Sequence, residues 1–201
     1  MKREALSRQV LARHEAGHLV ALAMLDAPGD FYWRRLTGYE IAHVAERQAE
    51  VQRWEEASAR DALIAKRAVV ALAGGAAERA ASSVAAGPAD DLAVIHAWTG
   101  SVDFELAHEW LTLQRYDGDQ AAIVADIVRL FGEVSAVLAR PTQQRAIAEI
   151  AIRIEARLAT ADQQGRSALS FPAMEVLAGI MLDPPPRFML KETVRTGGHP
   201  V

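Results

Sequence analysis

Residues 3–26 read REALSRQVLARHEAGHLVALAMLD. Apolar side chains recur through this stretch at helical spacing, at Leu6, Val10, Leu11, Leu19, Leu22 and Leu25. This period is typical of a helix that buries one face, and Pro28 with Gly29 supplies the break that ends it. We therefore expect a long first helix packed against a core.

The composition predicts that this helix belongs to a mainly helical domain. The chain has 201 residues, of which 51% are hydrophobic and 24% charged, so it can build a core and is not a disordered chain. Alanine, the best helix former, accounts for 40 residues, whereas aromatic residues account for only 6%. Such a composition favours helices over a β-sandwich or a β-barrel.

Charge, cysteine content and hydropathy limit the partners, the metal ligands and the cellular location that we expect for this protein. The net charge of −4 argues against a broad nucleic-acid or anionic membrane surface. The chain has no cysteine, so any metal would be held by histidine and carboxylate side chains. The opening residues lack the apolar segment of a signal peptide, and the uncharged stretch 19–25 is far shorter than the roughly 20 residues of a membrane span. We therefore expect a cytoplasmic protein with no nucleic-acid partner and no membrane span.

Further along the chain, the pattern predicts a small β element and several helices. Residues 31–36 and 38–44 are short and aromatic or alternating, and we expect a hairpin or an edge strand there. Helices are expected at residues 61–85, from 90 or 91 to 98, 103–114, 119–139, 142–159 and, after a turn at 162–165, briefly beyond Pro172. Three prolines at 184–186 end the helical region. We predict one mainly α domain over residues 1–183 with a small β hairpin or edge sheet, followed by an extended tail over 184–201.

The clearest chemical motif lies within the first helix, where His14 and His18 flank Glu15 in the sequence HEAGH. Histidines four positions apart stand on one helix face, so both imidazoles can reach a single Zn2+. The glutamate of this motif can take a proton from water and pass it to the leaving amine. The motif therefore predicts His14 and His18 as metal ligands and Glu15 as the catalytic base.

Two other interpretations of the histidines remain open. His14 and His18 continue the apolar stripe, so they could be buried histidines that hydrogen-bond to carbonyl or carboxylate groups without a metal. A di-iron carboxylate site is the rival metal site, because a Glu-x-x-His spacing repeats, at Glu15 and His18, Glu40 and His43, and Glu105 and His108. The second pair falls in a strand-like stretch, where residues three apart point to opposite faces. Solvated surface pairing is the plainer interpretation of the third pair.

A catalytic zinc needs a third protein ligand. Some HExxH enzymes supply a histidine six residues downstream, but that position is Met24. Others supply a glutamate from a second helix, but Glu40, Glu46 and Glu50 lie in strand or loop sequence. Neither arrangement fits this chain.

Three segments of the chain carry a resemblance to a known family. They are HEAGH with its apolar continuation LVALAMLDAP, the segment ALAGGAAE at 71–78, and Asp90, Asp91 and Leu92 after a glycine-containing break. Together they resemble the peptidase domain of the FtsH-type ATP-dependent zinc metalloproteases. In that family the aspartate just before the leucine is the third zinc ligand. The resemblance therefore implies that Asp91 is the third ligand, with Asp90 as the neighbouring alternative.

The resemblance also implies a zincin-type helical fold and a stand-alone zinc metallopeptidase. The chain contains no G-x-x-x-x-G-K-[ST] segment and so no ATPase of its own. Without a motor it would cut peptides, loops or unfolded polypeptides, and a separate ATPase or adaptor would have to deliver folded clients. The strand at 38–44 would pair with an extended polypeptide substrate if it lies at a sheet edge.

Two further expectations concern assembly and activity. The apolar helices after Asp119 would suit a homo-oligomer interface, since small side chains let helices approach closely, although a single-chain core explains them equally well. The competing functional hypothesis is a catalytically silent interaction module that keeps the fold and the zinc but cleaves nothing.

Overall fold

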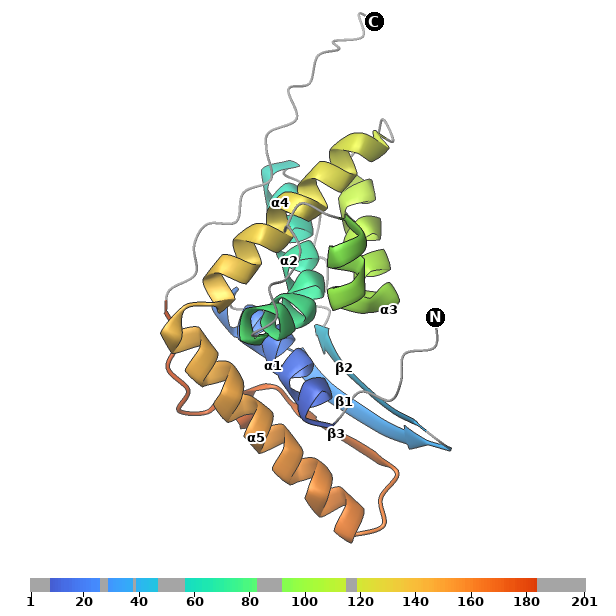
Figure 1. The fold of residues 1–201 in the computed structure, drawn as a ribbon, viewed down its shortest axis with the longest axis vertical. Coiled ribbons are helices and arrows are strands. Elements are labelled where there is room, and N and C mark those ends of the chain that lie inside the picture. The colour runs from blue at the N-terminus through green and yellow to red at the C-terminus, as the bar shows by residue number, and fades with distance from the viewer. Residues whose placement is uncertain are drawn as a thin grey trace, which may run out of the picture.

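The computed structural model describes residues 8–25, 29–37, 39–46, 57–82, 92–114 and 119–183 (Figure 1). Its helices are α1 (Arg8–Met24), α2 (Ala57–Ala81), α3 (Leu92–Gln114), α4 (Gln120–Leu138), α5 (Pro141–Gln163) and α6 (Met174–Leu177). Its strands are β1 (Gly29–Leu36), β2 (Tyr39–Glu46) and β3 (Ala168–Pro172). The predicted fold class, mainly α with a small sheet, is confirmed. The predicted tail at 184–201 lies outside the described residues.

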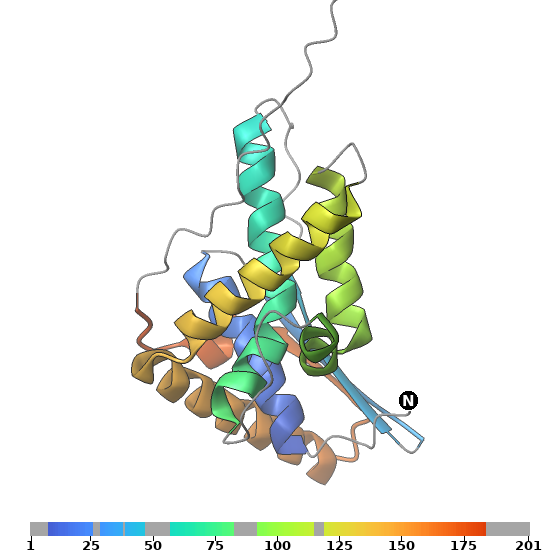
Figure 2. The same ribbon diagram turned by 45° about the horizontal axis from the view of Figure 1, so that its top comes forward.

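Helix α2 is the centre of the helical body and packs on α1, α3 and α4. Figure 2 shows it passing between these neighbours. Small residues make the close packing possible: a Cβ atom at Gly17 would lie 2.6 Å from the carbonyl oxygen of Ala73 and from the Cβ of Ala77. A Cβ atom at Gly75 would lie 2.6 Å from the backbone nitrogen of Thr99. Both α1 and α3 are therefore held at short range from α2.

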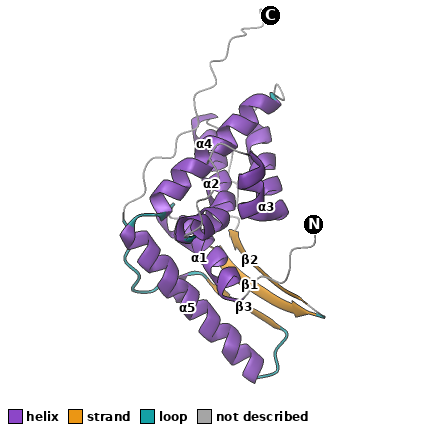
Figure 3. Ribbon diagram, in the orientation of Figure 1, coloured by secondary structure: helices purple, strands orange, loops and turns teal. Residues whose placement is uncertain are grey.

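The three strands form an antiparallel sheet in the order β2-β1-β3 along one flank of the helical body (Figure 3). The predicted hairpin corresponds to β1 and β2, and β2 is an edge strand, as expected. Phe31 and Trp33 alternate with exposed residues along β1 and are buried, as is Phe171 on β3. The Phe31 and Phe171 rings stack with their centroids 4.7 Å apart. The inner face of the sheet thus joins the core.

Strand β3 corrects the sequence prediction, which placed only a turn and a short helix in this region. The short helix beyond Pro172 is present as α6, but residues 168–172 pair with β1 before it. Five residues form a strand here because β1 supplies backbone partners from far away in the sequence. No pattern in the sequence near residues 168–172 predicts that pairing.

The element α3 consists of two helical segments, in agreement with the two helices that the sequence predicts for this region. The two segments meet at a kink at Gly100, where the backbone is not helical: φ is 76° and ψ is 166°. Glycine adopts a positive φ without the steric penalty that other residues meet. The second half of the helix can therefore take a direction different from the first.

Charged contacts tie the start of α1 to the sheet and to the end of α5. Arg8 pairs with Glu40 at 2.5 Å and with Asp162 at 2.7 Å. Arg35 pairs with the same two carboxylates, and the indole nitrogen of Trp33 donates to Glu40 at 3.2 Å. This cluster fixes the helix that carries the HEAGH motif against β1 and β2.

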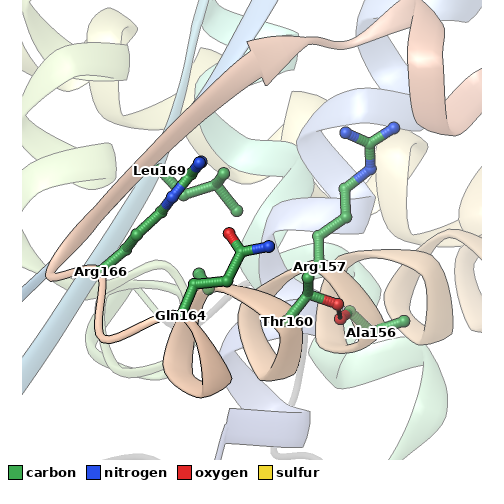
Figure 4. A pocket seen from close by; sticks show the side chains of 7 residues that line it. Ala156, Arg157, Thr160, Gln164, Arg166 and Leu169 are labelled. Atoms are coloured by element: carbon green, nitrogen blue, oxygen red, sulfur yellow. Dashed lines mark hydrogen bonds between the residues drawn. The ribbon is translucent and has the colours of Figure 1, made fainter.

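A hollow of about 380 Å³ lies between the end of α5 and β3 (Figure 4). Arg157, Gln164, Arg166 and Leu169 are among its lining residues, and none of the lining residues belongs to α1, α2 or α3. The hollow is therefore separate from the HEAGH motif.

Within the described part of the chain, no helix combines the length and apolar character that crossing a membrane requires.

Candidate metal centre

The residues of the HEAGH motif lie in the middle of α1 and are almost completely buried. His14 is 7% exposed, Glu15 3% and His18 5%. The two imidazole rings lie on the same side of the helix, with their centroids 4.8 Å apart. The structure therefore brings the predicted histidine pair together, as the four-residue spacing requires.

A carboxylate from α3 completes a three-residue cluster. Oδ2 of Asp103 lies 2.7 Å from Nε2 of His14 and 3.3 Å from Nε2 of His18. The candidate ligand atoms of these three residues all lie within 4.8 Å of one another. Asp103 follows the kink at Gly100 by three residues, so it is carried by the second half of α3. These three side chains are the candidate metal centre.

The other nitrogen of each imidazole is held by an acceptor on α2. Nδ1 of His14 lies 2.5 Å from Oε1 of Glu78, and Nδ1 of His18 lies 2.7 Å from the carbonyl oxygen of Val70. A carbonyl oxygen and a carboxylate oxygen only accept hydrogen bonds, so each Nδ1 carries the proton. In a neutral ring, each Nε2 therefore presents its lone pair toward Asp103. This arrangement is typical of metal-binding histidines, whose second nitrogen donates to a carboxylate or a carbonyl.

The lone pairs of both Nε2 atoms and the carboxylate of Asp103 meet at one point, so this arrangement is stable only with a positive charge there. Burial lowers the pKa of His14, but the hydrogen bonds to Asp103 and Glu78 outweigh it and raise that pKa to about 10. For His18, burial again lowers the pKa, and the charge of Asp103 and its hydrogen bond reverse the direction. Burial raises the pKa of Asp103, yet the neighbouring charge of His18 and the hydrogen bonds to both histidines bring it well below its usual range. Protons or a metal cation would satisfy the same demand.

Gly74 on α2 leaves open space beside the Nε2 atoms of both histidines. A Cβ atom at this position would lie 2.4 Å from Nε2 of His14 and 2.4 Å from Nε2 of His18. A side chain at this position would therefore block both ring nitrogens. Two imidazoles and one carboxylate are also a donor set that catalytic zinc uses. The donor atoms present therefore fit a zinc ion, and α2 leaves the ring nitrogens accessible to it.

Glu15 is a buried carboxylate beside this cluster. Its Oε2 atom is buried and has no hydrogen-bond partner among the described residues. Burial raises the pKa of Glu15, while the positive charges of His18 and His14 oppose the rise. An unpartnered buried carboxylate oxygen costs stability, so its presence here suits a chemical role better than a structural one.

The predicted third ligand, Asp91, lies outside the described residues, as does its neighbour Asp90. The sequence prediction does not include Asp103 of the cluster, nor Glu78 and Gly74, which contact its histidines from α2. Gly74 and Glu78 lie in the segment ALAGGAAE that carries part of the family resemblance. Their spacing of four residues places them on one helix face, and this was the available signal.

The rival di-iron arrangement is not formed. Glu40 pairs with Arg8 and Arg35, and the His43 ring stacks on Tyr32 at 5.0 Å. His108 lies 3.0 Å from the side chain of Gln120. None of these residues belongs to the cluster of His14, His18 and Asp103, so the repeated Glu-x-x-His spacing does not assemble one site.

Comparisons of the chain with protein-family models, with curated proteins and with solved structures find no match. The interpretation of the cluster therefore rests on its geometry and on the chemistry of its donor atoms.

Proposed function

We propose that this chain is a zinc-dependent metallopeptidase that hydrolyses peptide bonds in unfolded or flexible polypeptides. His14, His18 and Asp103 would hold the metal, and Glu15 would act as the catalytic base. When bound there, zinc would supply Lewis acidity, lowering the pKa of water toward neutrality and polarising the substrate carbonyl. The fold and activity implied by the resemblance to FtsH-type peptidases are part of the same proposal.

The observation that carries the proposal is the pairing of a three-ligand cluster with an unpartnered buried carboxylate. Glu78 and the carbonyl group of Val70 hold the protons of the two imidazoles on Nδ1, which leaves both Nε2 atoms as ligands. Oε2 of Glu15 has no hydrogen-bond partner among the described residues and would take a proton from water. The same oxygen would then deliver the proton to the leaving amine.

Strand β2 would hold the substrate in this proposal. It is the edge of the three-stranded sheet and packs on α1, the helix that carries the motif. An extended polypeptide added to a sheet edge gains main-chain hydrogen bonds without a requirement for particular side chains. Such binding suits a peptidase for unfolded chains. It also fits the expectation that a separate ATPase or adaptor would deliver folded clients.

The test is cleavage of casein by the 201-residue chain loaded with zinc. Glu15→Gln should reduce cleavage by roughly 10²–10⁴-fold, which is the usual contribution of a general acid–base group. Its zinc content should stay near that of the wild type, because the metal ligands are unchanged. Glu105→Gln, at an exposed position on α3, is the matched control and should cleave normally.

The result also separates the proposal from its main competitor. Zinc binding without any cleavage of casein or of flexible peptides by the wild type would favour the silent interaction module. Cleavage that survives in Glu15→Gln would overturn the assigned role of that residue. Loss of both zinc and cleavage in His14→Ala, with the fold retained, would support the metal-dependent mechanism.

A further inference from the structure

The outer face of the sheet, turned away from the core, carries six exposed side chains in two rows. His43, Tyr32 and Ser170 lie side by side across β2, β1 and β3, and Ile41, Arg34 and Ala168 form the next row. We call these six residues the outer sheet face. None of them belongs to the candidate metal centre.

A hollow of about 470 Å³ lies on the outer sheet face. Tyr32 and Arg34 on the central strand are long side chains, whereas their neighbours on β3, Ser170 and Ala168, are short. This difference in height leaves space above β3 beside the Tyr32 ring. The volume falls within the roughly 300–1,000 Å³ typical of small-molecule sites.

Tyr32 offers one ring face toward this space. Its other face is covered by the His43 ring, with centroids 5.0 Å apart and an interplanar angle of 14°. Tyr32 lies between His43 on β2 and Ser170 on β3. Because serine is too small to cover an aromatic ring, a planar group placed above Ser170 would extend the stack to three rings.

Arg34 supplies a positive charge in the adjoining row. Its neighbours across the sheet are Ile41 and Ala168, so no acidic residue lies opposite it. Arg35, the next residue, pairs with Glu40 and Asp162, whereas Arg34 forms no ion pair among the described residues. Alternate residues of a strand lie about 7 Å apart on one face, so the guanidinium is within reach of a group attached to a ring stacked on Tyr32.

We propose that the outer sheet face binds a small ligand made of a planar aromatic ring and an anionic group. The ring would stack on Tyr32 above Ser170, and its carboxylate or phosphate would pair with Arg34. The apolar side chains of Ile41 and Ala168 would line the path between the two groups. This site is independent of the metal centre, so a ligand would bind with or without zinc.

The test is a titration of the full chain by two-dimensional NMR with two probes, 3-phenylpropionate and AMP. Binding of either probe should shift the amide signals of β1 and β3 without affecting those of α1. The first probe represents an aromatic carboxylate and the second a nucleotide. Their relative affinities therefore show whether the site prefers a carboxylate or a phosphate as the anionic group. The neutral 3-phenylpropionamide and the ringless hexanoate should each bind at least roughly tenfold more weakly than 3-phenylpropionate.

Two variants locate the site. Arg34→Gln should weaken binding at least roughly tenfold by removing the charge. Ser170→Leu should do the same by filling the space beside Tyr32 while leaving ring and charge in place. Arg166→Gln is the matched control, because this exposed arginine lines the hollow beside α5 (Figure 4) and does not line the hollow on the outer sheet face. The variant should bind the probes like the wild type.

The proposal is overturned if neither probe binds at millimolar concentration to the folded protein. It is equally overturned if both probes bind but their affinities are unchanged in Arg34→Gln and Ser170→Leu. Circular dichroism of each variant confirms that the fold is retained, so a loss of binding reports on the site.

Discussion

Nε2 of His14 lies 2.7 Å from Oδ2 of Asp103, although 89 positions separate the two residues in the chain. This contact joins the helix that carries the HEAGH motif to the second half of α3. It brings an acceptor to the point at which both imidazoles aim their Nε2 atoms. A local motif therefore becomes a three-ligand cluster only through the packing of α1 and α3 on α2.

The assignment of the third ligand predicts the effect of removing each candidate aspartate. Asp103→Ala should lower zinc affinity by more than roughly 100-fold, beyond the range seen when outer-shell partners are lost. Asp91→Ala should leave affinity near the wild-type value. Competition with a chromogenic chelator measures both. Weak zinc binding by Asp91→Ala together with normal binding by Asp103→Ala would instead support the ligand that the family resemblance implies.

Glu78 should act on the metal through His14. Removing its carboxylate in Glu78→Ala frees the His14 ring to rotate and makes the ring nitrogen a weaker ligand, so zinc affinity should fall roughly 10–100-fold. Glu78→Gln keeps a carbonyl oxygen that accepts the hydrogen bond from Nδ1 of His14. Its zinc affinity should therefore fall less than that of Glu78→Ala. Equal zinc affinities of Glu78→Ala and the wild type would show that Glu78 does not support metal binding.

Gly74 should be intolerant of even one added methyl group. In Gly74→Ala, the Cβ atom would collide with both imidazoles at 2.4 Å, so zinc binding should be lost. The free energy of unfolding should fall by about 1–3 kcal/mol from overpacking. Gly132→Ala on α4 is the control, because a Cβ atom there meets nothing within 4 Å. That change should raise helix propensity and stabilise the chain by up to about 1 kcal/mol. Zinc titration and urea unfolding of the two variants check the contrast.

The ion pairs at the start of α1 predict a loss of stability in acid. Burial raises the pKa of Glu40, but hydrogen bonds from Arg8 and other donors bring it below its ordinary value. The pKa of Asp162 is lowered in the same way, with Arg8 as the main donor opposing burial. Both carboxylates are thus more acidic when the chain is folded. Their stabilisation is present above the ordinary carboxyl pKa of about 4 and is lost as the pH falls through the lowered values.

Urea unfolding of Arg8→Met measures this contribution. The variant should be less stable than the wild type by about 1 kcal/mol near neutral pH, because the pairs are partly exposed. The difference should shrink toward about pH 3, where the unfolded carboxyls become protonated. Arg145→Met, at an exposed position on α5, should show no such dependence on pH. A constant difference for Arg8→Met across this range would contradict the assignment.

Elements with a strong local signal could be predicted from the sequence, and elements that depend on distant partners could not. The HEAGH helix and the hairpin follow from periodicity and turn residues, and both are present. Strand β3 has only five residues, and its existence depends on pairing with β1. The two helical segments of α3 are also predicted from the sequence, and the non-helical Gly100 lies between them.

The residues of the candidate site also divide into those with a local sequence signal and those whose position depends on distant packing. His14 and His18 could be predicted because their spacing of four is enough to place both on one helix face. Asp103 could not be predicted, because its position depends on how far α3 bends and how closely it packs on α2. Glu78 had a weaker signal, since it shares a helix face with Gly74 in a segment that otherwise consists of alanine, leucine and glycine.

The adjacent glycines at 74 and 75 have an evolutionary consequence. One leaves room for the imidazoles of α1, and the other lets α3 approach closely enough to deliver Asp103. A single nucleotide change is enough to turn either glycine codon into one for alanine. One such step could thus produce a descendant that retains every histidine and acidic residue of the proposed zinc site and yet binds no zinc.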